Sequence, residues 1–264
     1  MRTLVRVFEQ AGGYGIHLAG TLTAQVTMLR DTILSFMRLD RRRLASAERQ
    51  IVSQILFTGV EALGLVAIVA LLCGITIVIQ AMNNMPRFGA SEYFGNIMII
   101  VVVRELGPLF TSLVIIGRSG SALATYIGNM RVRKEISSLE VMGIDPLHFI
   151  VIPAFMGMMI SMVALSVYFD IVAIIGGLLV ALLTVNVPFG IFITKVLQAL
   201  TVTDILVSVW KNVLFGQIIA IVSCYTGLQV TNEREVPKAA RNSVVTSMVT
   251  VMVLNVFVTL AFYG

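Results

Sequence analysis

Long apolar segments alternate with short polar ones along most of this chain. Four segments each hold about 20 or more mostly apolar residues with few charges, which is the length that a helix needs to cross a hydrocarbon core. They cover residues 55–80, 92–117, 205–230 and 243–263. The pattern predicts a transmembrane helix in each segment, and therefore an all-α polytopic membrane protein.

A fifth apolar segment, residues 149–187, is long enough for one very long span or two short ones, and Asp170 lies near its middle. Two crossings would place residues 231–242 outside the cell, whereas one crossing with a bent or re-entrant remainder would place them inside. This loop carries three bases, Arg234, Lys238 and Arg241. Because Lys and Arg accumulate in cytoplasmic loops, we predict five crossings and an external C-terminus, with six crossings as the alternative.

The loop after the second predicted span sets the orientation of the chain. Residues 117–146 should face the cytoplasm because they are rich in bases. These bases are Arg118, Arg131, Arg133 and Lys134.

Residues 1–54 form the first of two predicted regions, ahead of a membrane domain over residues 55–264. An apolar stripe at helical spacing is followed by three consecutive arginines at 41–43. This pattern is typical of an amphipathic helix lying in the membrane interface, although a helix packed on the rest of the protein would carry the same stripe. The stripe consists of Leu18, Leu22, Val26, Leu29, Ile33 and Phe36.

Composition agrees with a membrane protein. Hydrophobic residues make up 58% of the chain and charged residues only 12%, about half the charged fraction of a soluble domain. The net charge of +5 could suggest nucleic acid as a partner. Cytoplasmic loop charge explains it more simply, and we expect no nucleic acid.

Two adjacent charges, Arg104 and Glu105, lie in the middle of the second predicted span. A charge at mid-bilayer costs at least about 2.5–3.5 kcal/mol, so both should face protein or a water-filled cavity. Gly107 and Pro108 follow, and Pro108 can kink the helix and free backbone carbonyls. The charges could serve function, or they could form a structural ion pair; the two roles are compatible.

Lys211 is the only charge well inside the fourth crossing. It could pair with Glu105, contact an anionic headgroup, or snorkel to the interface. Asp170 and Glu61 are weaker candidates.

A short amphipathic helix is predicted at about residues 134–143, where Ile136, Leu139 and Met142 recur every three residues. Gly143 and then Pro146 give a normal helix stop. Such a helix in a cytoplasmic loop can dock into a groove on a soluble partner, or it can simply lie on the membrane.

Motifs for covalent chemistry are missing from the sequence. There is no phosphate-binding G-x-x-x-x-G-K-[ST] loop, no H-E-x-x-H, no G-x-S-x-G and no cysteine pair at metal spacing. We therefore expect no enzymatic activity, metal or cofactor in this chain itself. Work against a gradient would draw its energy from a partner.

The run from Arg104 to Pro146 resembles the MlaE/YrbE-type permeases, the membrane subunits of bacterial lipid ABC transporters that work with MCE-domain proteins. The matching pieces are RELGP (104–108), GRSGSALA (117–124), IGNM (127–130) and EISSLEVMGIDP (135–146). The similarity extends over roughly residues 50–264, so that residues 55–264 would be a permease domain.

The resemblance implies a homodimer in the bacterial inner membrane that moves phospholipids between the inner and outer membranes. A cytoplasmic ATPase, holding ATP and Mg, would supply the energy, and an MCE-domain protein would lie on the periplasmic side. Glu105 and Lys211 match polar positions near the family's lipid-binding cavity. The helix at 134–143 would be the coupling helix that docks into the ATPase, through Glu135, Ile136, Leu139, Glu140, Met142 and Gly143.

Two positions depart from the family pattern. Family members often have an acid where this chain has Tyr126, and Asp where it has Asn255. Asn255 can still hydrogen-bond, so we include it in the polar site, but it cannot balance a positive charge. The alternative function is an ion-coupled secondary transporter, with a proton on Glu105 or Asp170. Its usual sign is a pair of broken helices in related halves, and only Gly107–Pro108 is a candidate.

Overall fold

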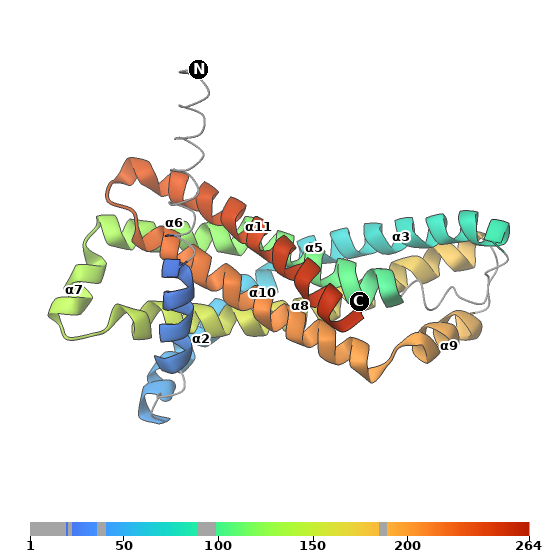
Figure 1. Ribbon diagram of the computed structural model, residues 1–264, viewed down its shortest axis with the longest axis horizontal. Helices are drawn as coiled ribbons and strands as arrows, with labels where there is room; N and C mark the ends of the chain where they lie inside the picture. Colours follow the sequence, from blue (N-terminus) through green and yellow to red (C-terminus); the bar gives the residue numbers. More distant parts are fainter. Residues whose placement is uncertain (1–19, 21–22, 36–40, 89–98, 185–188, 264) are drawn as a thin grey trace, which may run out of the picture.

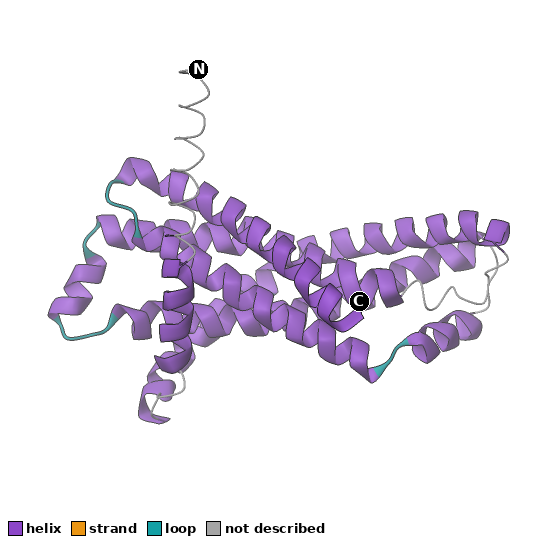
Figure 2. Ribbon diagram, viewed as in Figure 1, coloured by secondary structure: helices purple, strands orange, loops and turns teal. Residues whose placement is uncertain are grey.

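The computed structural model describes residues 20, 23–35, 41–88, 99–184 and 189–263, and within them the regular secondary structure is entirely helical (Figure 2). Of the stripe predicted for the N-terminal region, Leu18, Leu22 and Phe36 lie outside the described residues. Leu29 and Ile33 are partly buried and pack against the core of the protein.

Five helices in the described part of the chain are long and apolar enough to cross a membrane, which confirms the predicted all-α polytopic fold. They cover Glu48–Ala81, Ile99–Val132, Leu147–Leu183, Val202–Leu228 and Glu233–Tyr263. The fifth apolar segment is therefore one uninterrupted helix and not two short spans. Its last part is α8 (Ile152–Thr184), preceded by a π-helical turn, η5 (Leu147–Val151).

The other spans are also built from consecutive helical pieces. The first runs from within α2 (Arg41–Thr58) through η1 (Val60–Ala62) into α3 (Leu63–Phe88). The second contains η3 (Ile99–Leu106), α5 (Gly107–Ile115), η4 (Ile116–Gly120) and α6 (Ser121–Val132). The fourth is α10 (Val202–Leu228), and the fifth joins η6 (Glu233–Glu235) to α11 (Val236–Tyr263). The short helices α7 (Glu135–Val141) and α9 (Phe189–Ala199) lie at opposite ends of the bundle (Figure 1).

The second span is longer than the sequence pattern predicted, and this corrects the position of Arg118. The apolar segment was expected to end at residue 117, which placed Arg118 in the cytoplasmic loop. Instead the helix continues to Val132, and Arg118 forms an ion pair with Glu61 of the first span. The small side chains of residues 117–124 allow this continuation because they let neighbouring helices pack closely.

Helix α8 lies at the centre of the bundle and packs against α2, α3, α5 and α10. Two close approaches bring its backbone against neighbouring helices. A Cβ atom on Gly74 of α3 would lie 2.9 Å from Cα of Ala173, and one on Gly216 of α10 would lie 2.8 Å from Cα of Met159. Such contacts hold membrane helices together by van der Waals packing, because lipid offers no hydrophobic driving force between them.

We predict that Gly74→Val lowers the stability of the folded protein, because the added side chain must push α3 and α8 apart. Overpacking of this kind typically costs about 1–3 kcal/mol. Gly64→Val is the matched control, since it lies on the same helix with no atom within 4 Å of its Cβ position. Thermal unfolding in mild detergent should separate the two variants; equal melting temperatures would contradict this packing.

Candidate functional site

The polar site is built where the second span changes from a π-helix to an α-helix. Arg104 and Glu105 close the π-helical segment η3, and Gly107 and Pro108 open α5. Pro108 has no N–H, so the carbonyl of Arg104, which the amide at 108 would bond in a regular α-helix, is left free. That carbonyl accepts a hydrogen bond from Lys211 Nζ at 2.9 Å.

Lys211 is fully buried in the bundle and does not snorkel to the interface. Besides the Arg104 carbonyl, its ammonium group donates to Glu105 Oε1 at 3.2 Å and to Thr259 Oγ1 at 3.1 Å. These three acceptors match the three donors of an ammonium group. Of the roles considered for Lys211, the pairing with Glu105 is the one that the structure contains.

Glu105 is the centre of the cluster. In addition to the Lys211 contact, Thr259 donates to its Oε1 at 2.8 Å, and Asn255 Nδ2 donates to its Oε2 at 2.9 Å. Asn255 and Thr259 are both on α11, so one carboxylate joins the second, fourth and fifth spans. Asn255 thus takes part in the network through a hydrogen bond without adding a charge.

Arg104 points away from Glu105 and has its own partners. Its Nε lies 2.7 Å from Asp204 Oδ1, and its guanidinium carbon lies 4.4 Å from the centre of the Tyr263 ring. The Tyr263 hydroxyl donates to Asp204 Oδ1 at 3.3 Å, and Asp204 also forms a capping box with Thr201 at the start of α10. These contacts fasten the end of α11 to the beginning of α10.

The four charged side chains of the cluster balance one another. Arg104 and Lys211 supply two positive charges, and Glu105 and Asp204 supply two negative charges. Buried charges need an opposite charge beside them, and here Lys211 pairs with Glu105 while Arg104 pairs with Asp204. The cluster therefore presents no unpaired cation to a ligand in this conformation.

The sequence pattern identified Arg104, Glu105 and Lys211, and the family resemblance added Asn255. The structure brings all four together beside Gly107 and Pro108. The sequence pattern did not identify Asp204, Tyr263 or Thr259. The T-x-x-D spacing of Thr201 and Asp204 is a capping-box signal that could have drawn attention to Asp204. Nothing in the sequence distinguishes Tyr263 or Thr259 from other residues of an apolar span.

Asp170 is close to the cluster but not part of it. Its Oδ1 is buried against Gly107 and makes no hydrogen bond with a described residue. The described residues contain no group of three or more His, Cys, Asp or Glu side chains that could hold a metal ion.

Helix α7 lies at the far end of the bundle from the charge cluster (Figure 1). Lys134 (φ 60°) and Gly143 (φ 75°) flank it in the left-handed conformation that turns the chain. Ile136 is buried and Leu139 packs against the core, whereas Val141 and Met142 are 89% and 64% exposed. The surface open to a partner therefore contains these two apolar residues together with the exposed side chains of Glu135 and Glu140.

Fold and site together define a polytopic membrane protein with a cluster of paired charges inside its helix bundle. Residues 51–261 match the permease MlaE family, and the chain belongs to this family. It is 31% identical over 216 residues to the intermembrane phospholipid transport system permease protein MlaE of Haemophilus influenzae, covering 81% of this chain and 83% of that protein.

Relatives also occur in other organisms. A probable ABC transporter permease protein of Rickettsia prowazekii is 29% identical over 214 residues, covering 81% of this chain and 83% of the relative. The chloroplastic protein TRIGALACTOSYLDIACYLGLYCEROL 1 of Arabidopsis thaliana is 27% identical over 216 residues, covering 81% and 61%.

We predict that Lys211→Met destabilises the protein by about 3–5 kcal/mol, because it leaves the Glu105 carboxylate and the Arg104 carbonyl without their buried partner. Adding Glu105→Gln should recover part of the loss, since it removes the unpaired charge. The exposed Lys238→Met variant is the control. Unfolding of wild type, Lys211→Met, Glu105→Gln and the double variant in detergent gives the coupling energy; strictly additive effects would argue against the pair.

Proposed function

We propose that this chain is the permease subunit of an ABC transporter that moves phospholipids between the inner and outer membranes of a bacterium. The observation that carries the proposal is the match to the permease MlaE family over nearly the whole membrane domain. The relative from Haemophilus influenzae, which is named as an intermembrane phospholipid transport permease, gives the substrate class. The chain itself would bind and move lipid, and ATP hydrolysis with its Mg would take place in a separate subunit.

The proposed ATPase contact is α7, which we place in the cytoplasm. Val141 and Met142 offer an exposed apolar surface at the end of a hairpin between two spans. A short helix with such a surface can insert into a groove of a soluble partner. Helix α7 connects the second and third spans and packs against the core through Ile136. A movement of α7 would therefore also move these two spans.

The permease is proposed to act as a homodimer in the inner membrane, with an MCE-domain protein at its periplasmic end. Helix α11 offers a surface for the second copy, because one of its faces holds the charge cluster while the other is apolar and exposed. The exposed residues include Val245, Val249, Met252, Val256 and Leu260. A lipid cavity between two copies would then have a charge cluster on either side, one layer of side chains from the substrate.

The cluster suits a lipid pathway better than a proton pathway. Glu105 accepts hydrogen bonds from Lys211, Thr259 and Asn255, and these contacts join the second span to the fourth and fifth. The comparisons favour a lipid ABC permease over an ion-coupled secondary transporter.

We predict that Val141→Asp abolishes co-purification with the ATPase encoded beside this chain and the ATP hydrolysis of the complex. Val141 is 89% exposed, so its replacement leaves the folded permease intact. Leu183→Asp is the matched control. Leu183 is 86% exposed and lies at the end of α8 that is far from α7. If wild type binds no ATPase, the proposed function fails; if Val141→Asp binds normally, α7 is not the contact.

A further inference from the structure

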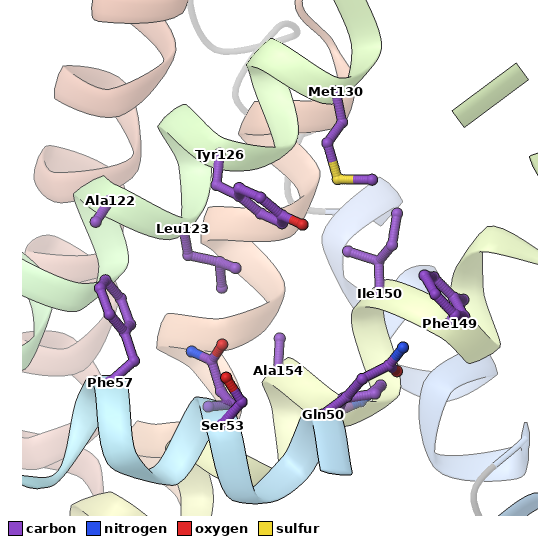
Figure 3. A pocket seen from close by; sticks show the side chains of 12 residues that line it. Gln50, Ser53, Phe57, Ala122, Leu123, Tyr126, Met130, Phe149, Ile150 and Ala154 are labelled. Atoms are coloured by element: carbon purple, nitrogen blue, oxygen red, sulfur yellow. The ribbon is translucent and has the colours of Figure 1, made fainter. Parts of the chain in front are cut away.

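A groove of about 500 Å³ opens on the side of the bundle, away from the charge cluster. It is bounded by α2, by α6 and by the η5–α8 junction (Figure 3). Its apolar wall contains Phe57, Leu123, Met130, Phe149, Ile150 and Pro153. Its polar lining is uncharged and contains Gln50, Ser53, Gln54 and Tyr126.

The floor and the deep end of the groove are fixed by contacts between the spans. Helix α2 lies directly on α8, since a Cβ atom on Gly157 would lie 2.6 Å from Cβ of Gln54. At the deep end Arg118 connects the two walls: its Nη1 donates to the Phe57 carbonyl at 2.9 Å, and it pairs with Glu61. Arg118 thus holds α2 beside the second span at one level, and the groove lies between this level and α7.

The groove runs parallel to the spans. Its lining extends from Gln50 to Phe57 on α2 and from Met130 back to Ala122 on α6. At about 1.5 Å per helical residue these stretches cover roughly 10–12 Å. This is a large part of one leaflet's hydrocarbon layer, which is about 15 Å if the core is about 30 Å thick.

We propose that the groove holds one acyl chain of a phospholipid from the leaflet on the α7 side. Both bounding helices belong to segments that are long and apolar enough to cross a membrane, and we take the opening to face lipid. Among the described residues, the lining has no charged side chain that would favour an ion or a charged peptide. A volume of about 500 Å³ falls within the usual range for small-molecule sites.

Polar groups in the groove suit the ester region of such a lipid. The Tyr126 hydroxyl points into the groove (Figure 3), and no described residue accepts a hydrogen bond from it or from Gln50 or Ser53. These side chains are uncharged donors that can bond to ester or glycerol oxygens. The site rests on the proposed function only in taking the α7 end as cytoplasmic. It would let a lipid of the leaflet at that end bind to the side of the permease.

The test is photolabelling of the purified full-length chain in nanodiscs of phosphatidylethanolamine and phosphatidylglycerol. A small fraction of the lipid carries a diazirine near the end of one acyl chain, and adducts are mapped by mass spectrometry. We expect adducts on groove residues such as Leu123 and Ile150 to exceed those on the lipid-facing Ile68 and Leu72 of α3 several-fold. Equal labelling would overturn the proposal, because it would mean ordinary contact with the bilayer.

Two variants and a control separate the groove from its surroundings. Ala122→Phe fills the groove, and Tyr126→Glu places a carboxylate in it; Tyr126 is 59% exposed, so this change spares the core. Both should reduce groove labelling to the level of α3, whereas Leu56→Phe, on the exposed side of α2, should leave it unchanged. Unchanged labelling in both filled variants would contradict the proposal.

Occupation of the groove by protein would also contradict the proposal. In that case a photoreactive residue substituted for Ser53 would cross-link to residues 1–19 or to a second copy of the chain, and not to lipid. The labelling needs no ATPase, so failure of this site leaves the permease function standing. Failure to bind an ATPase, in turn, leaves the labelling result unaffected.

Discussion

The arrangement of the bundle depends on one buried cation. Lys211 can be placed inside a membrane only if its three donors are satisfied. Its partners lie on two other spans: the carbonyl of Arg104 and the carboxylate of Glu105 on the second, and the hydroxyl of Thr259 on the fifth. The Arg104 carbonyl is free to accept because Pro108 has no N–H to donate to it. The Glu105 carboxylate lies next to this interruption of the second span. The helix break and the lysine therefore stabilise each other, and the relative positions of α5, α10 and α11 follow from this contact.

A second consequence is that the four charged side chains of the cluster are neutral as a group. Arg104 is engaged by Asp204 and Tyr263, and Glu105 by three donors. A ligand headgroup could bind such a cluster only by displacing an existing partner, so binding would be coupled to a movement of α11. The groove between α2 and α6 is different, because its polar groups are uncharged, and Gln50, Ser53 and Tyr126 have no hydrogen-bond partner among the described residues. The two regions suit different parts of an amphiphile, one its headgroup and the other its tail.

The sequence was sufficient for the spans and for the centre of the cluster, because both follow from the high free-energy cost of polar groups in hydrocarbon. Length and hydropathy located the apolar segments, and Arg104, Glu105 and Lys211 were noticed because a charge there needs a partner.

Asp204 and Tyr263 were missed because they lie at helix ends, where polar residues are ordinary. Arg118 was assigned to a loop because the apolar segment ends at residue 117 and bases follow it, although small residues promote helix packing in membranes. The groove could not be predicted, because its shape depends on three segments far apart in sequence. The N-terminal region, the direction of insertion and the docking role of α7 stay predictions.

The central claim is that ATP hydrolysis in a partner drives phospholipid movement through this chain. The most direct measurement is transfer of a fluorescent phospholipid in proteoliposomes that contain the permease, its ATPase and its MCE-domain partner. The proposed function predicts transfer that requires ATP, stops with a hydrolysis-deficient ATPase and is indifferent to a proton gradient. Transfer driven by a proton gradient in vesicles that contain the permease alone would contradict it.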